Sequence, residues 1–162
     1  MKETFKQIYH QYFDAIRSYL YYRSGDADLA TDLTQDVFIK IWEKQMEIDL
    51  KHIKSLLYKI AGDLFVSYCR RQKLSENYAK TIPLALVSKT EPDAQLEYQE
   101  LKANYEYKLA QLPEKRRVVF LMSRMDALTY KEIAERLGIS TKAVEKRMSL
   151  ALNDLRTIMQ KT

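Results

Sequence analysis

The sequence predicts an all-α protein, made of two small helical domains joined by a flexible linker. Apolar residues recur at three- and four-residue intervals through most of the chain, and no segment shows the alternation typical of a half-buried strand. Only three glycines and three prolines interrupt the 162 residues. We expect a first domain at residues 1–74, a linker at 75–93 and a second domain at 94–162, each near the smallest size at which a helical core is stable alone.

Two helices are expected at the start of the chain. The first, over residues 4–23, carries eight large side chains on one side, namely Phe5, Ile8, Tyr9, Tyr12, Phe13, Ile16, Tyr19 and Leu20. In the turn SGDAD, Asp26 is placed to cap the next helix. That helix has an acidic first half, with Asp28, Asp32 and Asp36. Acidic residues stabilise a helix N-terminus through its dipole, so these residues alone leave two explanations open, helix stabilisation and a docking face.

A third helix is expected from about Asp49 to the basic run CRRQK. Arg70 and Arg71 lie near its C-terminus, where the helix dipole favours cations, so a structural role and a binding role are both open. Tyr58 is a candidate for stacking on a nucleic-acid base. The periodicity then fades into the linker, whose apolar stretch at residues 82–87 predicts partial packing on a domain or a partner.

The C-terminal domain carries the excess of positive charge. We expect a helix over residues 94–112, with Tyr105 among its buried residues, and then a helix whose first turn holds Pro113 and whose Arg116 and Arg117 face solvent. From residue 113 to the C-terminus there are eleven Lys and Arg and six Asp and Glu, while the whole chain has a net charge of +5. A polyanionic partner fits this distribution.

The segment YKEIAERLGISTKAVEKRMSLALNDLR, at residues 130–156, predicts a helix-turn-helix. Thr129 and Glu132 fit a capping box, Gly138 supplies the turn, and Ser140 can cap the second helix. In a helix-turn-helix the polar face of the second helix enters the DNA major groove. The candidate contacts on that face are Lys142, Glu145, Lys146 and Ser149 for base edges and Arg147 for a phosphate. The alternative, a helix pair with a solvated charged face, explains fewer of these features.

Residues 112–156 resemble the promoter-binding C-terminal domain of bacterial sigma factors of the extracytoplasmic-function (ECF) group. The family pattern LPxxxRxVxxL, YxEIAxxLGIS and TVxxRxxxAxxxL runs from Leu112 to Leu155, and Ala143 stands where the family usually has Thr. The resemblance implies that this domain reads the −35 promoter element as duplex. Further phosphate contacts are expected from Arg117, Tyr130 and Lys131. Quorum-sensing-type response regulators carry a similar helix-turn-helix, but the βα receiver pattern that they need is not visible.

The N-terminal domain resembles the same family. DADLATDLTQDVFIKIWEK is similar to the segment that binds the clamp helices of the RNA polymerase β′ subunit. The residues on its D-x-x-Q-x-x-F-x-x-x-W pattern are Asp32, Gln35, Asp36, Phe38 and Trp42. IAGDLFVSYCRR resembles the run that opens and holds the −10 element, which implies −10 contacts for Lys59, Asp63, Arg70 and Arg71. Gly62, Asp63 and Ser67 replace the family's Arg, Asn and Asp, so the −10 base preference is open.

Several classes of function lack a basis in this sequence. Cys69 is the single cysteine, His10 and His52 lack ligand spacing, and no Gly-rich phosphate loop appears, so we expect no enzyme activity, no cofactor and no metal. No apolar run approaches the ~20 residues that span a membrane, and MKETFKQ is not a signal peptide. A cytoplasmic protein without membrane insertion is expected.

The predicted function is therefore that of a bacterial transcription initiation factor. Its partners would be core RNA polymerase, bound through the β′ clamp helices, and promoter DNA, and the family analogy adds an anti-sigma factor. Two alternatives stay open. One is a stand-alone regulator that binds duplex DNA as a dimer without polymerase. The other is a helical adaptor or anti-sigma-like protein, which would show no salt-dependent DNA binding.

Overall fold

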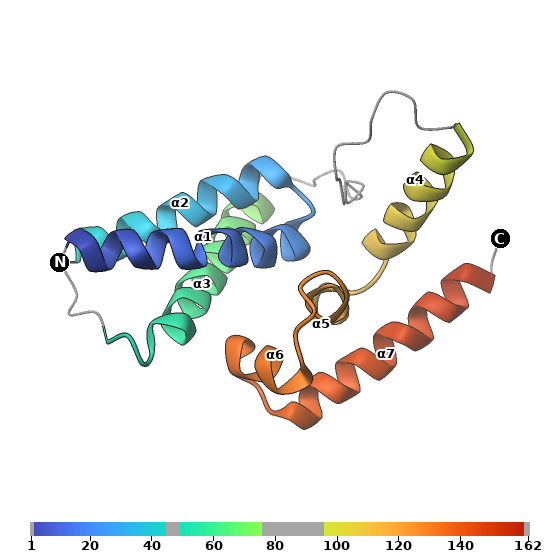
Figure 1. Cartoon of the computed structure of the whole chain (residues 1–162). Helices are drawn as coiled ribbons and strands as arrows, with labels where there is room; N and C mark the ends of the chain where they lie inside the picture. The colour runs from blue at the N-terminus through green and yellow to red at the C-terminus, as the bar shows by residue number, and fades with distance from the viewer. Residues whose placement is uncertain (1, 45–48, 76–95, 161–162) are drawn as a thin grey trace.

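The computed structural model describes residues 2–44, 49–75 and 96–160, which form seven helices and no strand (Figure 1). The N-terminal half consists of α1 (Lys2–Ser24), α2 (Ala27–Glu43) and α3 (Ile53–Ser75). The C-terminal half consists of α4 (Leu96–Ala110), α5 (Glu114–Arg124), α6 (Tyr130–Leu137) and α7 (Thr141–Gln160). The all-α prediction is confirmed, whereas the apolar stretch at 82–87 lies outside the described residues.

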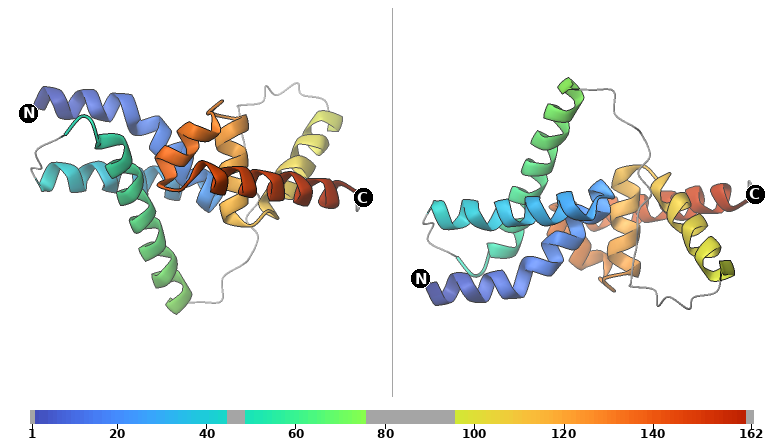
Figure 2. Two further views of the ribbon diagram at one scale, coloured as in Figure 1. Left: turned by 90° about the horizontal axis from the view of Figure 1, so that it is seen from below. Right: turned by 90° about the horizontal axis from the view of Figure 1, so that it is seen from above.

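The N-terminal half is an antiparallel pair, α1 and α2, crossed by α3 (Figures 1 and 2). Its core contains Ile8, Ile16, Leu20, Ala30, Leu33, Val37, Phe38, Ile41, Leu57, Ala61 and Phe65. The predicted cap of α2 is confirmed, because the Asp26 side chain accepts a hydrogen bond from the backbone N–H of Leu29 at 3.1 Å. Helix α3 begins later than predicted, since Asp49 accepts bonds from the Lys51 amide and the His52 ring and holds the preceding residues in a turn.

The C-terminal half is built around the long helix α7, which packs on α4, α5 and α6. Its core contains Leu109, Leu112, Val118, Val119, Phe120, Leu121, Met122, Ile133, Ala134, Val144, Met148, Ala151 and Leu155. The burial predicted for Tyr105 is wrong, because 46% of this residue is exposed.

The helix-turn-helix geometry is fixed by the local signals that the sequence contains. The Thr129 side chain accepts from the Glu132 amide at 3.1 Å, and the Glu132 carboxylate accepts from the Thr129 amide at 3.0 Å. Gly138 has φ +68°, the left-handed conformation that ends α6. The Ser140 hydroxyl then accepts from the Ala143 amide at 3.1 Å and caps α7. All three predicted caps are confirmed.

The two halves pack directly on each other, which the sequence did not predict. The C-terminal part of α1 lies against α5, and α3 lies against α6. In two further views α5 sits beside the end of α1, while the start of α1 and the end of α7 lie at opposite ends of the molecule (Figure 2). This arrangement places several polar residues of one half against the other half.

Candidate nucleic-acid and partner surfaces

Helix α7 presents a polar, mostly basic face away from its core. Val144, Met148, Ala151 and Leu155 are buried at helical spacing, which fixes the rotation of the helix. The predicted base-reading residues all lie exposed on the other side, namely Lys142, Glu145, Lys146 and Ser149. Arg147 is half-buried at the flank. This arrangement brings together side chains that can donate to and accept from base edges in a major groove.

The start of α6 exposes Tyr130 and Lys131, the two predicted phosphate contacts at a helix N-terminus. The carboxylate of Glu132 sits at the same position, where the Thr129 backbone and hydroxyl bonds hold its pKa below the ordinary value. Lys131 and the helix dipole would therefore attract an incoming phosphate at this position. The one nearby negative charge, that of Glu132, is already engaged in the cap.

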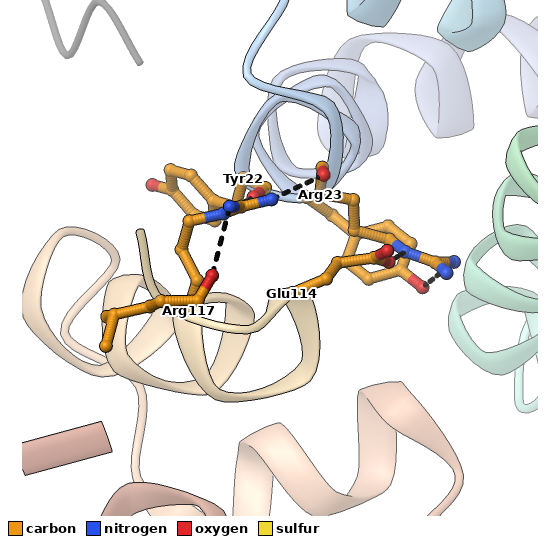
Figure 3. Close-up of polar contacts among 6 residues, drawn as sticks. Tyr22, Arg23, Glu114 and Arg117 are labelled. Atoms are coloured by element: carbon orange, nitrogen blue, oxygen red, sulfur yellow. Dashed lines mark hydrogen bonds and ion pairs between the residues drawn. The ribbon is translucent and has the colours of Figure 1, made fainter. Parts of the chain in front are cut away.

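Arg117 lies elsewhere than the sequence predicts. Its Nε donates to the Tyr22 carbonyl at 2.8 Å and its Nη2 to the Arg23 carbonyl at 2.7 Å, both in α1 (Figure 3). Its Nη1 donates to the Ala110 and Leu112 carbonyls, each at 3.3 Å. Burial holds the pKa of this guanidinium below its ordinary value. The guanidinium donates to four backbone carbonyl oxygens and the residue is half-buried, so the predicted exposure to solvent is wrong.

The prediction that Arg116 faces solvent is also wrong. This side chain is half-buried, and its Nη1 donates to the Asp154 carboxylate at 2.6 Å. The pair joins α5 to α7 within the C-terminal half. A basic residue at this position thus orients the long helix rather than extending the charged surface.

Three further polar contacts join the halves. Arg23 forms an ion pair with Glu114, and the Tyr22 hydroxyl donates to Asp126 Oδ1 at 2.7 Å. Arg136 Nη1 donates to the Tyr58 hydroxyl at 3.1 Å. Burial raises the pKa of Tyr22, Tyr58 and Asp126, which is the expected cost of placing ionisable groups in an interface. Tyr58 is only 4% exposed, so the predicted stacking on a base has no accessible ring here.

The exposed face of α3 carries the predicted −10 residues. Lys59, Asp63, Arg70 and Arg71 are all exposed. Val66 lies among them with 38% of its surface exposed. Three cations and one acid along a surface helix form a mostly basic track, and such a track suits a nucleic-acid backbone.

Four of the five predicted docking residues on α2 are exposed, namely Asp32, Gln35, Asp36 and Trp42. Phe38, the fifth predicted docking residue, is 2% exposed and belongs to the core. Trp42 is 49% exposed and packs edge-on against Phe5, with ring centroids 5.0 Å apart.

Sequence analysis missed part of this surface. Phe38 and Trp42 line an open groove of about 570 Å³, whose other lining residues are Lys2, Phe5, Tyr9, Gln35 and Ile39. From the sequence, Phe5 and Tyr9 belong to the eight large side chains on one side of the first helix, and nothing in their spacing sets them apart as groove residues. Ile39, next to Phe38 in the sequence, is half-exposed and adds to this apolar surface.

Family comparisons match both halves of the chain. The family model for sigma-70 region 2 matches residues 8–74, and the model for sigma-70 region 4 matches residues 103–155. The ferric citrate uptake sigma factor FecI of Escherichia coli strain K12 is 31% identical over 92% of this chain and 87% of its own length. The chain belongs to the ECF group of the sigma-70 family. This sigma factor is thus a transcription initiation factor that directs RNA polymerase, and the stand-alone regulator is not favoured.

Another relative is an ECF sigma factor, and two solved structures share the fold. The ECF RNA polymerase sigma factor SigW of Bacillus subtilis strain 168 is 28% identical over 96% of this sigma factor and 88% of its own length. The fold of the present chain is similar to that of the sigma factor RpoE in complex with the anti-sigma factor NepR from Bartonella quintana, with a TM-score of 0.67, 23% identity and 98% of each chain covered. It is also similar to CnrH in complex with the cytosolic domain of CnrY, with a TM-score of 0.64, 19% identity and coverage of 99% and 90%.

Two kinds of feature are absent from the described residues. In the segments 2–44, 49–75 and 96–160, no group of three or more His, Cys, Asp or Glu is arranged to hold a metal ion. None of the helices described for this sigma factor combines the length and the apolar character needed to cross a membrane.

Proposed function

We propose that this sigma factor docks on the β′ clamp helices of core RNA polymerase through α2, captures the −10 element with α3 and reads the −35 element with α7. The observation that carries the proposal is the exposed polar face of α7, held on a capped helix-turn-helix whose other face is fully buried. A helix in this setting can enter a major groove, which is wide enough for it and presents a distinct pattern for each base pair.

For the −35 element, Lys142 and Lys146 are the donors suited to guanine or phosphate, Glu145 is an acceptor suited to cytosine N4, and Ser149 pairs with several bases. Arg147, Tyr130 and Lys131 lie at the edges of this face, where backbone phosphates pass. Arg117 reaches a phosphate only if it leaves the carbonyl oxygens of α1, so we place it outside the reading surface in the packed arrangement.

For the −10 element, the exposed residues Lys59, Arg70 and Arg71 are the candidate phosphate contacts, and Asp63 is a candidate base contact. A track of cations on one helix face supports binding of a single strand, because its phosphates are spaced along an extended backbone. Gly62, on the same helix, offers no side chain to the strand.

For polymerase docking, Asp32, Gln35 and Asp36 offer polar contacts, while Trp42 offers apolar surface next to the groove. Phe38 contributes as the floor of that groove. An anti-sigma factor is a second proposed partner, supported by the similarity in fold to the sigma factor RpoE in its complex with the anti-sigma factor NepR. A sigma factor that acts on bacterial polymerase works in the cytoplasm, and we propose that location.

The experiment that tests this proposal is a titration of the purified protein with bacterial core RNA polymerase, followed by run-off transcription on a promoter library. Saturable core binding and promoter-dependent transcripts are expected, and the transcripts report the −35 and −10 sequences together. Tight duplex binding without affinity for any of several bacterial cores would instead indicate a regulator that works without polymerase.

A further inference from the structure

The last turn of α1 directs one arginine onto α3. The Cζ atom of Arg23 lies 4.6 Å from the ring centroid of Phe65, a residue of α3, and 5.7 Å from that of Tyr19. Its Nη1 donates to the Tyr19 hydroxyl at 3.2 Å. The side chain is 18% exposed. Two aromatic rings and a hydroxyl thus hold this guanidinium in a fixed position against the helix that carries the −10 candidates.

Gly62 has no side chain, and the guanidinium of Arg23 lies in the space beside it. A Cβ atom built on Gly62 would lie 3.4 Å from Arg23 Nη1 and 3.4 Å from the Tyr19 hydroxyl, so a longer side chain at this position would compete with the guanidinium. Lys73 follows Gly62 by eleven residues, about three helical turns, and therefore lies on the same line along α3. Lys59 and Arg70 are exposed on the adjoining face. Arg23 thus adds a cation from α1 to the basic track of α3.

The carboxylate that pairs with the Arg23 guanidinium belongs to the other half of the molecule. Glu114, in the first turn of α5, lies 91 positions later in the sequence and pairs with Arg23 Nε (Figure 3). Glu114 and Tyr19 raise the pKa of Arg23 against the lowering effect of its burial. A planar guanidinium that binds a carboxylate presents the same fork of donors to a phosphate. Glu114 thus occupies a position where a DNA phosphate can bind.

We infer that Arg23 is a phosphate-binding residue of the N-terminal half, and that Glu114 occupies it while the two halves are packed together. Its ligand is a backbone phosphate of single-stranded promoter DNA lying along α3, so the inference rests on the function proposed above. The packed arrangement and the DNA strand then compete for one guanidinium. Loss of the Glu114 charge increases the affinity for single-stranded DNA, and this gain depends on Arg23.

The test is a double-mutant cycle on the full chain, read by the fluorescence anisotropy of a labelled single-stranded 15-mer of mixed sequence. Glu114→Gln keeps the size of the side chain and removes its charge, and we expect about threefold to tenfold tighter binding. Adding Arg23→Gln should abolish that gain and reduce the slope of log affinity against log salt by about one. Equal affinity of the single and the double variant would overturn the inference, as would an affinity of Glu114→Gln no higher than that of the wild type.

Two controls separate this site from general effects of charge and stability. Glu135→Gln makes the same change in net charge at an exposed position of α6, and an equal gain in that variant would also overturn the inference. Arg23→Lys in the Glu114→Gln background keeps the charge without the fork of donors and should retain only part of the gain. Run-off transcription by the wild-type protein tests the proposed function separately. If transcription succeeds but the double-mutant cycle does not give the expected result, the phosphate-binding role of Arg23 is rejected and the proposed function stands.

Discussion

Arg117 Nε donates to the backbone carbonyl of Tyr22 at 2.8 Å, across 95 positions of sequence. The carbonyl lies in the last turn of α1, where a helix has no amides left to satisfy its final carbonyl oxygens. Arg117 therefore caps a helix of one half from a helix of the other half. The same guanidinium also binds carbonyls at the end of its own preceding helix, so it ties α1, α4 and α5 together.

Replacing Arg117 by Ala should lower the free energy of unfolding by about 2 to 4 kcal/mol, because buried carbonyls lose a charged donor. Denaturant unfolding of the full chain measures this change. Arg124→Ala is the matched control, since that arginine of α5 is exposed, and it should cost less than about 1 kcal/mol. Equal losses in both variants would mean that the carbonyl contacts add nothing to stability.

Asp126→Asn should stabilise the protein at pH 7 by up to about 1 kcal/mol, since solvent screens this half-buried group. Burial raises the pKa of the Asp126 carboxyl, while the Tyr22 hydroxyl bond and Arg136 oppose that rise. A raised folded-state pKa means that the carboxyl's favourable contribution is complete below the ordinary pKa of an aspartate and is lost as the pH rises through the folded-state pKa. Asn keeps the acceptor oxygen without the charge.

The measurement for Asp126 is chemical denaturation of both proteins between pH 3.5 and pH 8. The advantage of the Asn variant should shrink as the pH falls toward the ordinary pKa of an aspartate. A difference in stability that stays constant over this range would show that the charge of Asp126 does not matter.

Lys146→Ala should weaken recognition of one −35 base pair by ~1 to 3 kcal/mol, because Lys146 lies exposed on the face of α7 proposed to read bases. Competition binding with a set of single base-pair variants of the −35 element measures this. Lys131→Ala is the control for a phosphate contact, and it should weaken binding to every sequence alike. A uniform loss for Lys146→Ala would place that residue on a phosphate.

Asp36→Arg should reduce the affinity for core polymerase at least tenfold while leaving DNA binding by the C-terminal half intact, because it reverses a charge on the proposed docking face of α2. Titration of labelled protein with core polymerase measures the first effect. Asp14→Arg, an equal change at an exposed position of α1, is the matched control. Unchanged core affinity in Asp36→Arg would remove this face from the docking surface.

Gly138→Ala should destabilise the protein by about 1 to 2 kcal/mol. The residue has φ +68° and no atom within 4 Å of a built Cβ, so the cost comes from backbone strain without a steric clash. Thermal unfolding measures the loss, and replacement of Gly138 by Asn, which tolerates the left-handed conformation better, should recover part of it. Equal midpoints for the wild type and the Ala variant would show that the turn relaxes without strain.

The sequence by itself determined the features whose causes are local. The caps at Asp26, Thr129 and Ser140 and the turn at Gly138 depend on contacts within three or four residues, and the structure has each as predicted. The buried stripe of α7 follows from helical periodicity in the same way. Because these signals set which face of α7 is exposed, the candidate base-reading residues could be named without any tertiary information.

The tertiary structure alone decided which charged and aromatic residues face another part of the chain. Arg117, Arg116 and Tyr58 are residue types that often bind ligands at a protein surface. In the structure, each of them instead contacts a group at least 38 positions away in the sequence. Arg23 and Glu114 are brought together from different halves in the same way. Helical periodicity specifies a face but not what covers it, because the covering surface depends on how separate helices pack.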